Sequence, residues 1–122
     1  MELYRQILQL DSENIDAINS MAQCLRATLN GNPAILAEIF ALYQRAILID
    51  PEDFETNFNL GVLYFEHKKD YDKAIDHLKL AINEEENATA CFNLAIIYDE
   101  KGQSQEAMKA YHRVSKNLPC QY

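Results

Sequence analysis

The chain has 122 residues, 48% of them hydrophobic, and its 19 acidic against 11 basic side chains give a formal net charge of −8. Its length fits one domain, and its charge disfavours a nucleic-acid-binding protein, which needs clustered Lys and Arg to meet the phosphate backbone. The acidic balance favours a basic or apolar-basic partner, although an acidic surface also serves solubility alone.

Helix signals dominate the chain, and we find no alternating strand pattern. Only 3 Gly and 3 Pro interrupt it, and apolar residues recur at helical spacing. We expect Asn32 to cap the helix that begins at Pro33, Asp50 to cap the next one with Pro51 in its first turn, and Ser104 to cap the last. The bodies of the predicted helices cover residues 14–27, 33–49, 54–67, 71–83, 88–101 and 104–117.

The segment 1–11 differs from the rest. Its pattern Tyr4-x-x-Ile7-Leu8-x-Leu10-Asp11 echoes Tyr43-x-x-Ala46-Ile47-x-Ile49-Asp50, the end of the second predicted helix. We therefore expect the chain to start partway through a repeat, as a fragment of a longer solenoid, as a shortened chain, or with a first repeat that a partner completes.

The three cysteines, Cys24, Cys91 and Cys120, are odd in number, widely spaced and without a C-x-x-C motif. This pattern disfavours a disulfide framework or a zinc site. Cys24 and Cys91 fall on apolar helix faces and are expected in the core, whereas Cys120 is expected as a free thiol in the tail. We therefore expect a reduced compartment.

No run of the sequence approaches the roughly 18 consecutive apolar residues of a membrane-spanning helix. The N-terminus also lacks the basic start, apolar stretch and cleavage site of a signal peptide. The prediction is a cytoplasmic protein that binds neither membrane nor nucleic acid.

A sequence repeat organises the chain. The motif Leu60-Gly61-x-x-Tyr64 returns as Leu94-Ala95-x-x-Tyr98, with the same offset at each position (94 − 60, 95 − 61, 98 − 64). A period of about 34 residues is typical of helix–turn–helix arrays, in which no pair buries its apolar face alone.

The repeats resemble the tetratricopeptide repeat, whose pattern is W-x-x-L-G-x-x-Y, then A-x-x-x-F, then P. The second repeat reads Asn57-x-x-Leu60-Gly61-x-x-Tyr64, then Ala74-x-x-x-Leu78. The third reads Cys91-x-x-Leu94-Ala95-x-x-Tyr98, then Ala107-x-x-x-Tyr111, then Pro119. The first matches more weakly and reads Ile18-x-x-Met21-Ala22-x-x-Leu25, then Ile39-x-x-x-Tyr43, then Pro51. The small residues Gly61, Ala95 and Ala74 suit the crossing of two helices. Lys68-Lys69 adds one residue to the turn of the second repeat.

The resemblance implies an all-α, right-handed superhelical solenoid of about three helix pairs with a leading partial helix. It covers nearly the whole chain as one domain, 1–122. The expected boundaries are a partial repeat at 1–11 and repeats at 14–50, 53–86 and 88–118.

No motif of the sequence carries chemistry. His67, His77 and His112 form no H-x-x-x-H or H-E-x-x-H site, and the Glu84–Glu86 run lacks the alternating ligands of a calcium loop. The sequence therefore predicts no enzyme, no cofactor and no metal.

In tetratricopeptide proteins the first helix of each pair lines a concave groove. The groove residues that the resemblance implies are Asn19, Gln23, Glu55, Phe58, Asn59, Val62, Phe65, Phe92, Asn93, Ile96 and Asp99. Phe58 and Phe92 lie one repeat period apart (92 − 58), so we expect them side by side, either as an exposed apolar strip or as core. Asn59 and Asn93 are expected either to bind peptide backbone or to bond the adjacent helix.

Some family members grip acidic C-terminal peptides with Lys and Asn at groove positions. Here those positions hold Asn19, Phe58 and Phe92, then Gln23, Val62 and Ile96. An acidic peptide is therefore not the expected ligand.

The predicted function is a non-catalytic protein–protein interaction scaffold that binds an apolar-basic peptide or helix of a partner in this groove. One alternative is a small tetratricopeptide chaperone of a secretion-type client. Another is a structural segment of a larger intracellular assembly, and uncapped ends would allow self-association.

Overall fold

A computed structural model of the chain describes residues 6, 14–84 and 86–120. The partial helix expected over 1–11 lies, apart from residue 6, outside the described residues. The elements are α2 (Ile15–Ala27), α3 (Pro33–Ile49), α4 (Phe54–Leu63), a π-helical segment η1 (Tyr64–Lys68), α5 (Tyr71–Glu84), α6 (Ala88–Lys101) and α7 (Ser104–Ser115). No described residue lies in a strand, and the six predicted helices are found.

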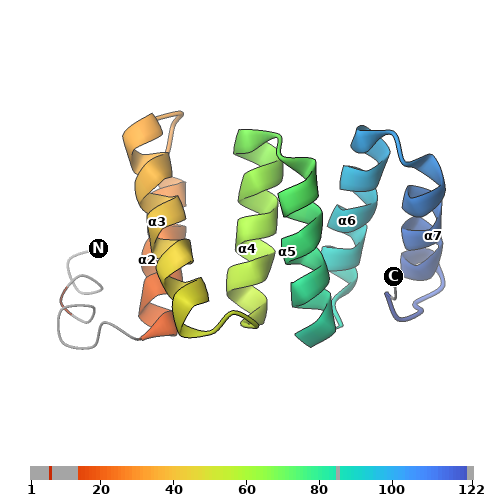
Figure 1. The fold of residues 1–122 in the computed structure, drawn as a ribbon, viewed down its shortest axis with the longest axis horizontal. Coiled ribbons are helices and arrows are strands. Elements are labelled where there is room, and N and C mark those ends of the chain that lie inside the picture. The colour runs from red at the N-terminus through yellow and green to blue at the C-terminus, as the bar shows by residue number, and fades with distance from the viewer. Residues whose placement is uncertain (1–5, 7–13, 85, 121–122) are drawn as a thin grey trace. The chain divides into compact units, whose positions relative to one another are not determined.

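The chain divides into two compact units, Met1–Pro51 and Glu52–Tyr122, and each is described by itself. The first unit holds the pair α2 and α3 (Figure 1). In the second unit α4 packs on α5, α5 on α6 and α6 on α7, so two helix pairs follow one another (Figure 1). The single domain over 1–122 and its repeat boundaries stay predictions.

In the first unit, the helix starts are set by two asparagines. The Asn14 side-chain oxygen accepts a hydrogen bond from the Ala17 N–H at 3.0 Å. Asn32 accepts one from the Ala34 N–H at 2.9 Å and Pro33 is the first helical residue, as predicted. The pair closes over a core of fully buried side chains: Ile18, Ala22, Ile39, Tyr43 and Ala46.

Two predicted caps are wrong. Asp50 ends α3, because its N–H still donates to the Ala46 carbonyl at 3.0 Å, and Asp53 caps α4 by accepting from the Thr56 N–H at 3.0 Å. Ser104 is the first residue of α7, which follows Gln103 without a side-chain capping bond.

The helix predicted over 54–67 changes to π-helical geometry at Tyr64. The extra residue of the second repeat is taken up there, because a π-turn holds one residue more than an α-turn. The Asp70 N–H therefore reaches back six residues to the Tyr64 carbonyl, whereas the Gln103 N–H reaches back five to Tyr98. The left-handed residue that ends the helix is consequently Lys69 (φ 52°) in one repeat and Gly102 (φ 89°) in the other.

Gly61 lies where α4 crosses α5. A Cβ atom on Gly61 would lie 2.8 Å from Cγ of Leu78 and 3.2 Å from the Ala74 carbonyl oxygen. The absence of a side chain therefore allows the close approach that the repeat motif predicted. The buried core of α5, α6 and α7 comprises Ala74, Ile75, Leu78, Ile82, Ala90, Leu94, Ile97, Tyr98 and Ala107.

Candidate functional site

A cavity of about 210 Å³ lies between the α4–η1 segment and α6, within the second unit. It is lined by Val62, Phe65, Glu66, Asn93, Ile96 and Ile97. Four of these residues belong to the predicted groove: Val62, Phe65, Asn93 and Ile96. They come together because Val62 and Ile96 are equivalent positions of consecutive repeats (96 − 62 = 34), and the residue three away on each helix shares the same face.

The cavity walls are mostly apolar, and neighbouring side chains hold the ring of Phe65 in place. Val62, Phe65 and Ile96 are half-buried. The Phe65 ring packs on Tyr71, with ring centres 6.0 Å apart, and Lys69 Nζ lies 5.3 Å from its centre. The aromatic contact and the cation–π contact each stabilise this position of the Phe65 ring by roughly 0.5–1 kcal/mol.

The two phenylalanines expected side by side each have their own aromatic neighbour. Phe58 stacks on Phe54, with ring centres 5.8 Å apart, and also packs against the buried core. Phe92 is 45% exposed and meets Tyr111 edge-on at 5.7 Å. A continuous strip of the two rings stays a prediction.

The surroundings of the cavity carry acidic side chains. Glu66 lines it and is exposed. Glu55 is exposed on α4, and Asp99 and Glu100 are exposed on α6. A cationic group close to the cavity would therefore be attracted.

The other predicted groove residues differ in accessibility. Asn59 is buried, and its side-chain amide nitrogen has no hydrogen-bond partner within the described residues. Asn19 and Gln23 lie in the first unit, where Asn19 is buried and Gln23 is exposed. Contact of Asn19, Gln23 or Asn59 with a partner stays a prediction.

A polar network that the sequence analysis missed joins α4 to α5. His77 Nδ1 lies 2.9 Å from Asn57 Oδ1, and Asn57 Nδ2 donates to the Asp53 carbonyl at 3.0 Å. The His77 ring stacks on Tyr64 at 5.6 Å, and Lys73 Nζ lies 5.4 Å from the centre of the Tyr64 ring. Asn57 at the tryptophan position of the repeat was the available signal, since a buried amide requires a partner.

This environment favours neutral His77. Burial lowers the pKa of the imidazole from 6.5; the charge of Asp76 opposes this shift, and that of Lys73 adds to it. Because Asn57 Nδ2 is already a donor to Asp53, its Oδ1 is the acceptor and His77 Nδ1–H is the donor. This tautomer is assigned from the network.

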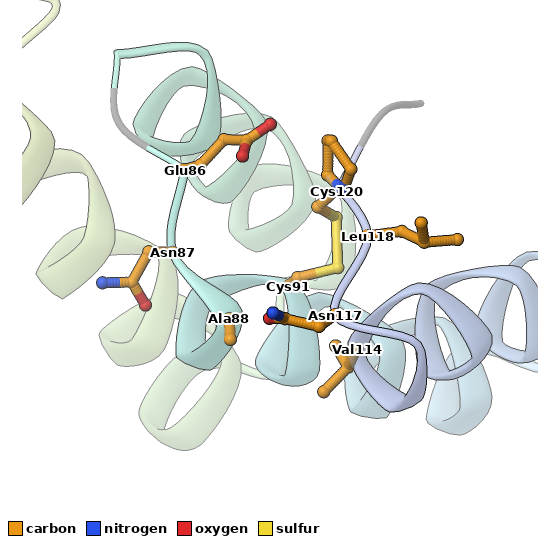
Figure 2. A pocket seen from close by; sticks show the side chains of 9 residues that line it. Glu86, Asn87, Ala88, Cys91, Val114, Asn117, Leu118 and Cys120 are labelled. Atoms are coloured by element: carbon orange, nitrogen blue, oxygen red, sulfur yellow. A yellow bond between two sulfur atoms is a disulfide. The ribbon is translucent and has the colours of Figure 1, made fainter.

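The cysteine prediction is corrected by the structure: Cys91 and Cys120 form a disulfide (Figure 2), and Cys24 is free. The expectation of no disulfide, with Cys120 as a free thiol, is therefore wrong. The cause is the fold of the tail after α7, which turns back onto α6 across a separation of 29 residues. Sequence spacing alone does not show such an approach.

We also searched the described part of the chain for a metal site and for a membrane-spanning helix. Within it, no group of three or more His, Cys, Asp or Glu side chains could hold a metal ion. Likewise, none of the helices traced there has the length and apolar character needed to cross a bilayer.

Two family models, each described as a tetratricopeptide repeat, match residues 42–76 and 88–116, together more than half of the chain. The chain belongs to the tetratricopeptide repeat family. The predicted membership and the all-α fold class of tetratricopeptide helix pairs are confirmed.

Crystal structures of MamA are similar to this tetratricopeptide chain. One has a TM-score of 0.78 at 21% identity, covering 91% of this chain and 62% of MamA; a second has 0.77 at 21%, covering 91% and 58%. This chain thus spans about 60% of their length, and at this identity the likeness shows the fold alone. No curated protein matches the chain in sequence. Tetratricopeptide repeats generally serve as non-enzymatic scaffolds that bind proteins.

Proposed function

We propose that this chain is a non-catalytic scaffold that binds an apolar-basic helix or extended segment of a partner protein between α4 and α6. The observation that carries the proposal is the cavity formed by Val62, Phe65 and Ile96 with Glu66 beside them. Its volume of about 210 Å³ is below the roughly 300 Å³ at which sites for drug-sized molecules begin. It suits a single large apolar side chain that anchors a longer segment.

The charge of the chain supports a cationic flank on that segment. The net charge is −8, and Glu66, Asp99 and Glu100 are exposed on the elements that border the cavity. Complementary charge raises the association rate and selects against acidic partners. The absence of a lysine clamp at Val62 and Ile96 agrees with this preference.

The second candidate is a structural segment of a larger assembly, which associates through α7. Met108 on α7 is 69% exposed, whereas Ile75, its equivalent on α5 (108 − 75 = 33), is 7% exposed. An apolar side chain that α5 buries is thus exposed on α7, which supports the predicted self-association. The secretion-type chaperone and the cytoplasmic location stay predictions with no observation of their own.

The binding proposal is tested with two synthetic helices of equal length, one of Leu and Lys and one of Leu and Glu, followed by fluorescence anisotropy. The basic helix should bind, and the acidic one should bind at least tenfold more weakly. Ile96→Ser should weaken the basic helix at least tenfold, while Leu80→Ser, an exposed leucine outside the cavity, should not. Equal binding of both helices, or an equal effect of both variants, would overturn the proposal.

Light scattering over a concentration series tests the second candidate. Mass should rise with concentration for the native chain and stay monomeric for Met108→Lys. A monomer at all concentrations would contradict a structural role that depends on association through α7.

A further inference from the structure

The tail after α7 folds back along the end of the α6–α7 pair. Asn117 takes a left-handed conformation (φ 55°), and the Leu118 N–H donates to the Arg113 carbonyl at 2.8 Å. Arg113 Nη1 in turn donates to the Pro119 carbonyl at 3.0 Å. Leu118 points away from Cys91 (Figure 2) and is 48% exposed. Cys120 packs against the buried residues of α6 and α7, and its disulfide with Cys91 joins the tail to α6.

The space that receives Cys120 exists because of Ala110. Cys91 is equivalent to Asn57 (91 − 57 = 34), and Ala110 is equivalent to His77 (110 − 77 = 33). In the second repeat the His77 imidazole fills the position beside Asn57. In the third, the methyl group of Ala110 leaves room, and the Cys91 sulfur lies 3.8 Å from the Ala110 carbonyl oxygen.

Cys120 lines two cavities. One, of about 240 Å³, is lined by Glu86, Asn87, Ala88, Cys91, Val114, Asn117, Leu118, Pro119 and Cys120 (Figure 2). The other, of about 320 Å³, is lined by Leu94, Tyr98, Glu106, Lys109, Ala110, Arg113 and Cys120. Cys120 therefore forms part of the wall of both cavities.

We infer that Cys91 and Cys120 form a reversible thiol–disulfide switch that fastens the tail over the cleft between α6 and α7. Reduction releases Cys120 from α6, loosens the tail residues before it and opens the two cavities that Cys120 lines. The α6–α7 pair itself stays folded, because Leu94, Ala95 and Ala107 lie in apolar clusters whose buried residues all belong to α5, α6 and α7.

The chemistry uses the difference in accessibility between the two sulfurs. Cys91 is 1% exposed, whereas Cys120 is partly exposed. The Cys120 thiolate attacks oxidised glutathione, releases one glutathione thiolate and keeps a mixed disulfide. The Cys91 thiolate then attacks Cys120 Sγ and releases the second glutathione, so two protein thiols are oxidised and one glutathione disulfide is reduced. Reduction reverses this sequence, beginning with attack on Cys120.

The direct test equilibrates a Cys24→Ser chain in glutathione buffers of increasing reducing power. Thiol counting should show zero thiols in the oxidised buffer and two in the reduced one, with recovery on reoxidation. Amide hydrogen exchange at Asn117 and Leu118, whose N–H groups are hydrogen-bonded in the folded tail, should be at least tenfold faster when reduced, while helicity and exchange in α6 stay unchanged. A disulfide that fails to form, a tail whose exchange does not respond, or unfolding of α7 on reduction would each overturn the switch.

A second variant tests the role of Ala110 separately. Ala110→His should fill the space beside Cys91 and reduce the fraction oxidised at a fixed glutathione ratio at least tenfold. Gln105→His adds the same side chain at an exposed position of α7 and should leave that fraction unchanged. If both variants fold, as judged by circular dichroism, and oxidise equally, the steric argument is wrong.

Discussion

Asn57 on α4 and His77 on α5 meet at 2.9 Å and join the two helices of the second repeat by a side-chain hydrogen bond. The equivalent positions of the third repeat are Cys91 and Ala110, and those of the first are Ile18 and Leu42. The same two positions thus hold an apolar pair in the first repeat and a hydrogen-bonded pair in the second. In the third repeat one of them holds a disulfide-bonded cysteine. The consequences of the hydrogen-bonded pair can be measured.

The neutral form of His77 should make stability depend on pH. Its pKa is lowered by burial from 6.5, so the unfolded chain binds more protons than the folded one as pH falls below about 6.5. The stability contributed by neutral His77 is therefore full above that pH and is lost as pH falls towards the folded pKa.

Urea unfolding of the native chain and of His77→Gln between pH 8 and pH 5 checks this prediction. Gln cannot titrate, so differences that arise from the 19 acidic side chains cancel in the comparison. The native chain should lose more stability than the variant as pH falls. Parallel pH profiles would show that His77 titrates as it does in the unfolded chain.

Gly61→Ala should destabilise the second repeat by about 1–3 kcal/mol, the range for overpacking a core. The added methyl group would lie 2.8 Å from Cγ of Leu78, which is fully buried. Denaturant unfolding measures the loss. Combining Gly61→Ala with Leu78→Ala should show a favourable coupling of about 0.5 kcal/mol or more, as residues in contact do; strict additivity would place the strain elsewhere.

Lys69 should be strained by its left-handed backbone. Glycine adopts φ near 52° without the Cβ penalty, whereas alanine does not. Lys69→Gly should therefore be about 1 kcal/mol more stable than Lys69→Ala in thermal or urea unfolding. Both variants lose the contact of Lys69 with the Phe65 ring, so their difference isolates the backbone. A lower stability of the glycine variant would contradict the π-helical ending.

Glu66→Lys should weaken binding of the basic Leu–Lys helix several-fold, mainly through a slower association rate. Glu66 lines the cavity, whereas Glu84, exposed at the end of α5, does not. Glu84→Lys makes the same change in net charge and should have a smaller effect. Stopped-flow measurements of the association rate at two salt concentrations separate the local effect of residue 66 from the effect of net charge. Equal effects of the two variants would mean that only net charge matters.

The repeat period predicted the helices, because the apolar spacing and the small residues at Gly61 and Ala74 are local patterns. It also predicted that Val62 and Ile96 would lie on one face, since equivalent positions follow the period. It did not predict the π-helical turn, because an extra residue can enter a helix or a loop. The disulfide was missed because it depends on a chain reversal at Asn117 and on the small size of Ala110, which only the folded tail brings together.

Affinity capture from cells followed by mass spectrometry shows whether the site between α4 and α6 holds a protein partner. The native chain, Ile96→Glu in the cavity and Leu80→Glu outside it would be compared after each is shown to be equally folded. We expect a protein partner that the native chain and Leu80→Glu retain and that Ile96→Glu loses. A partner that Ile96→Glu retains in full would contradict a binding site between α4 and α6.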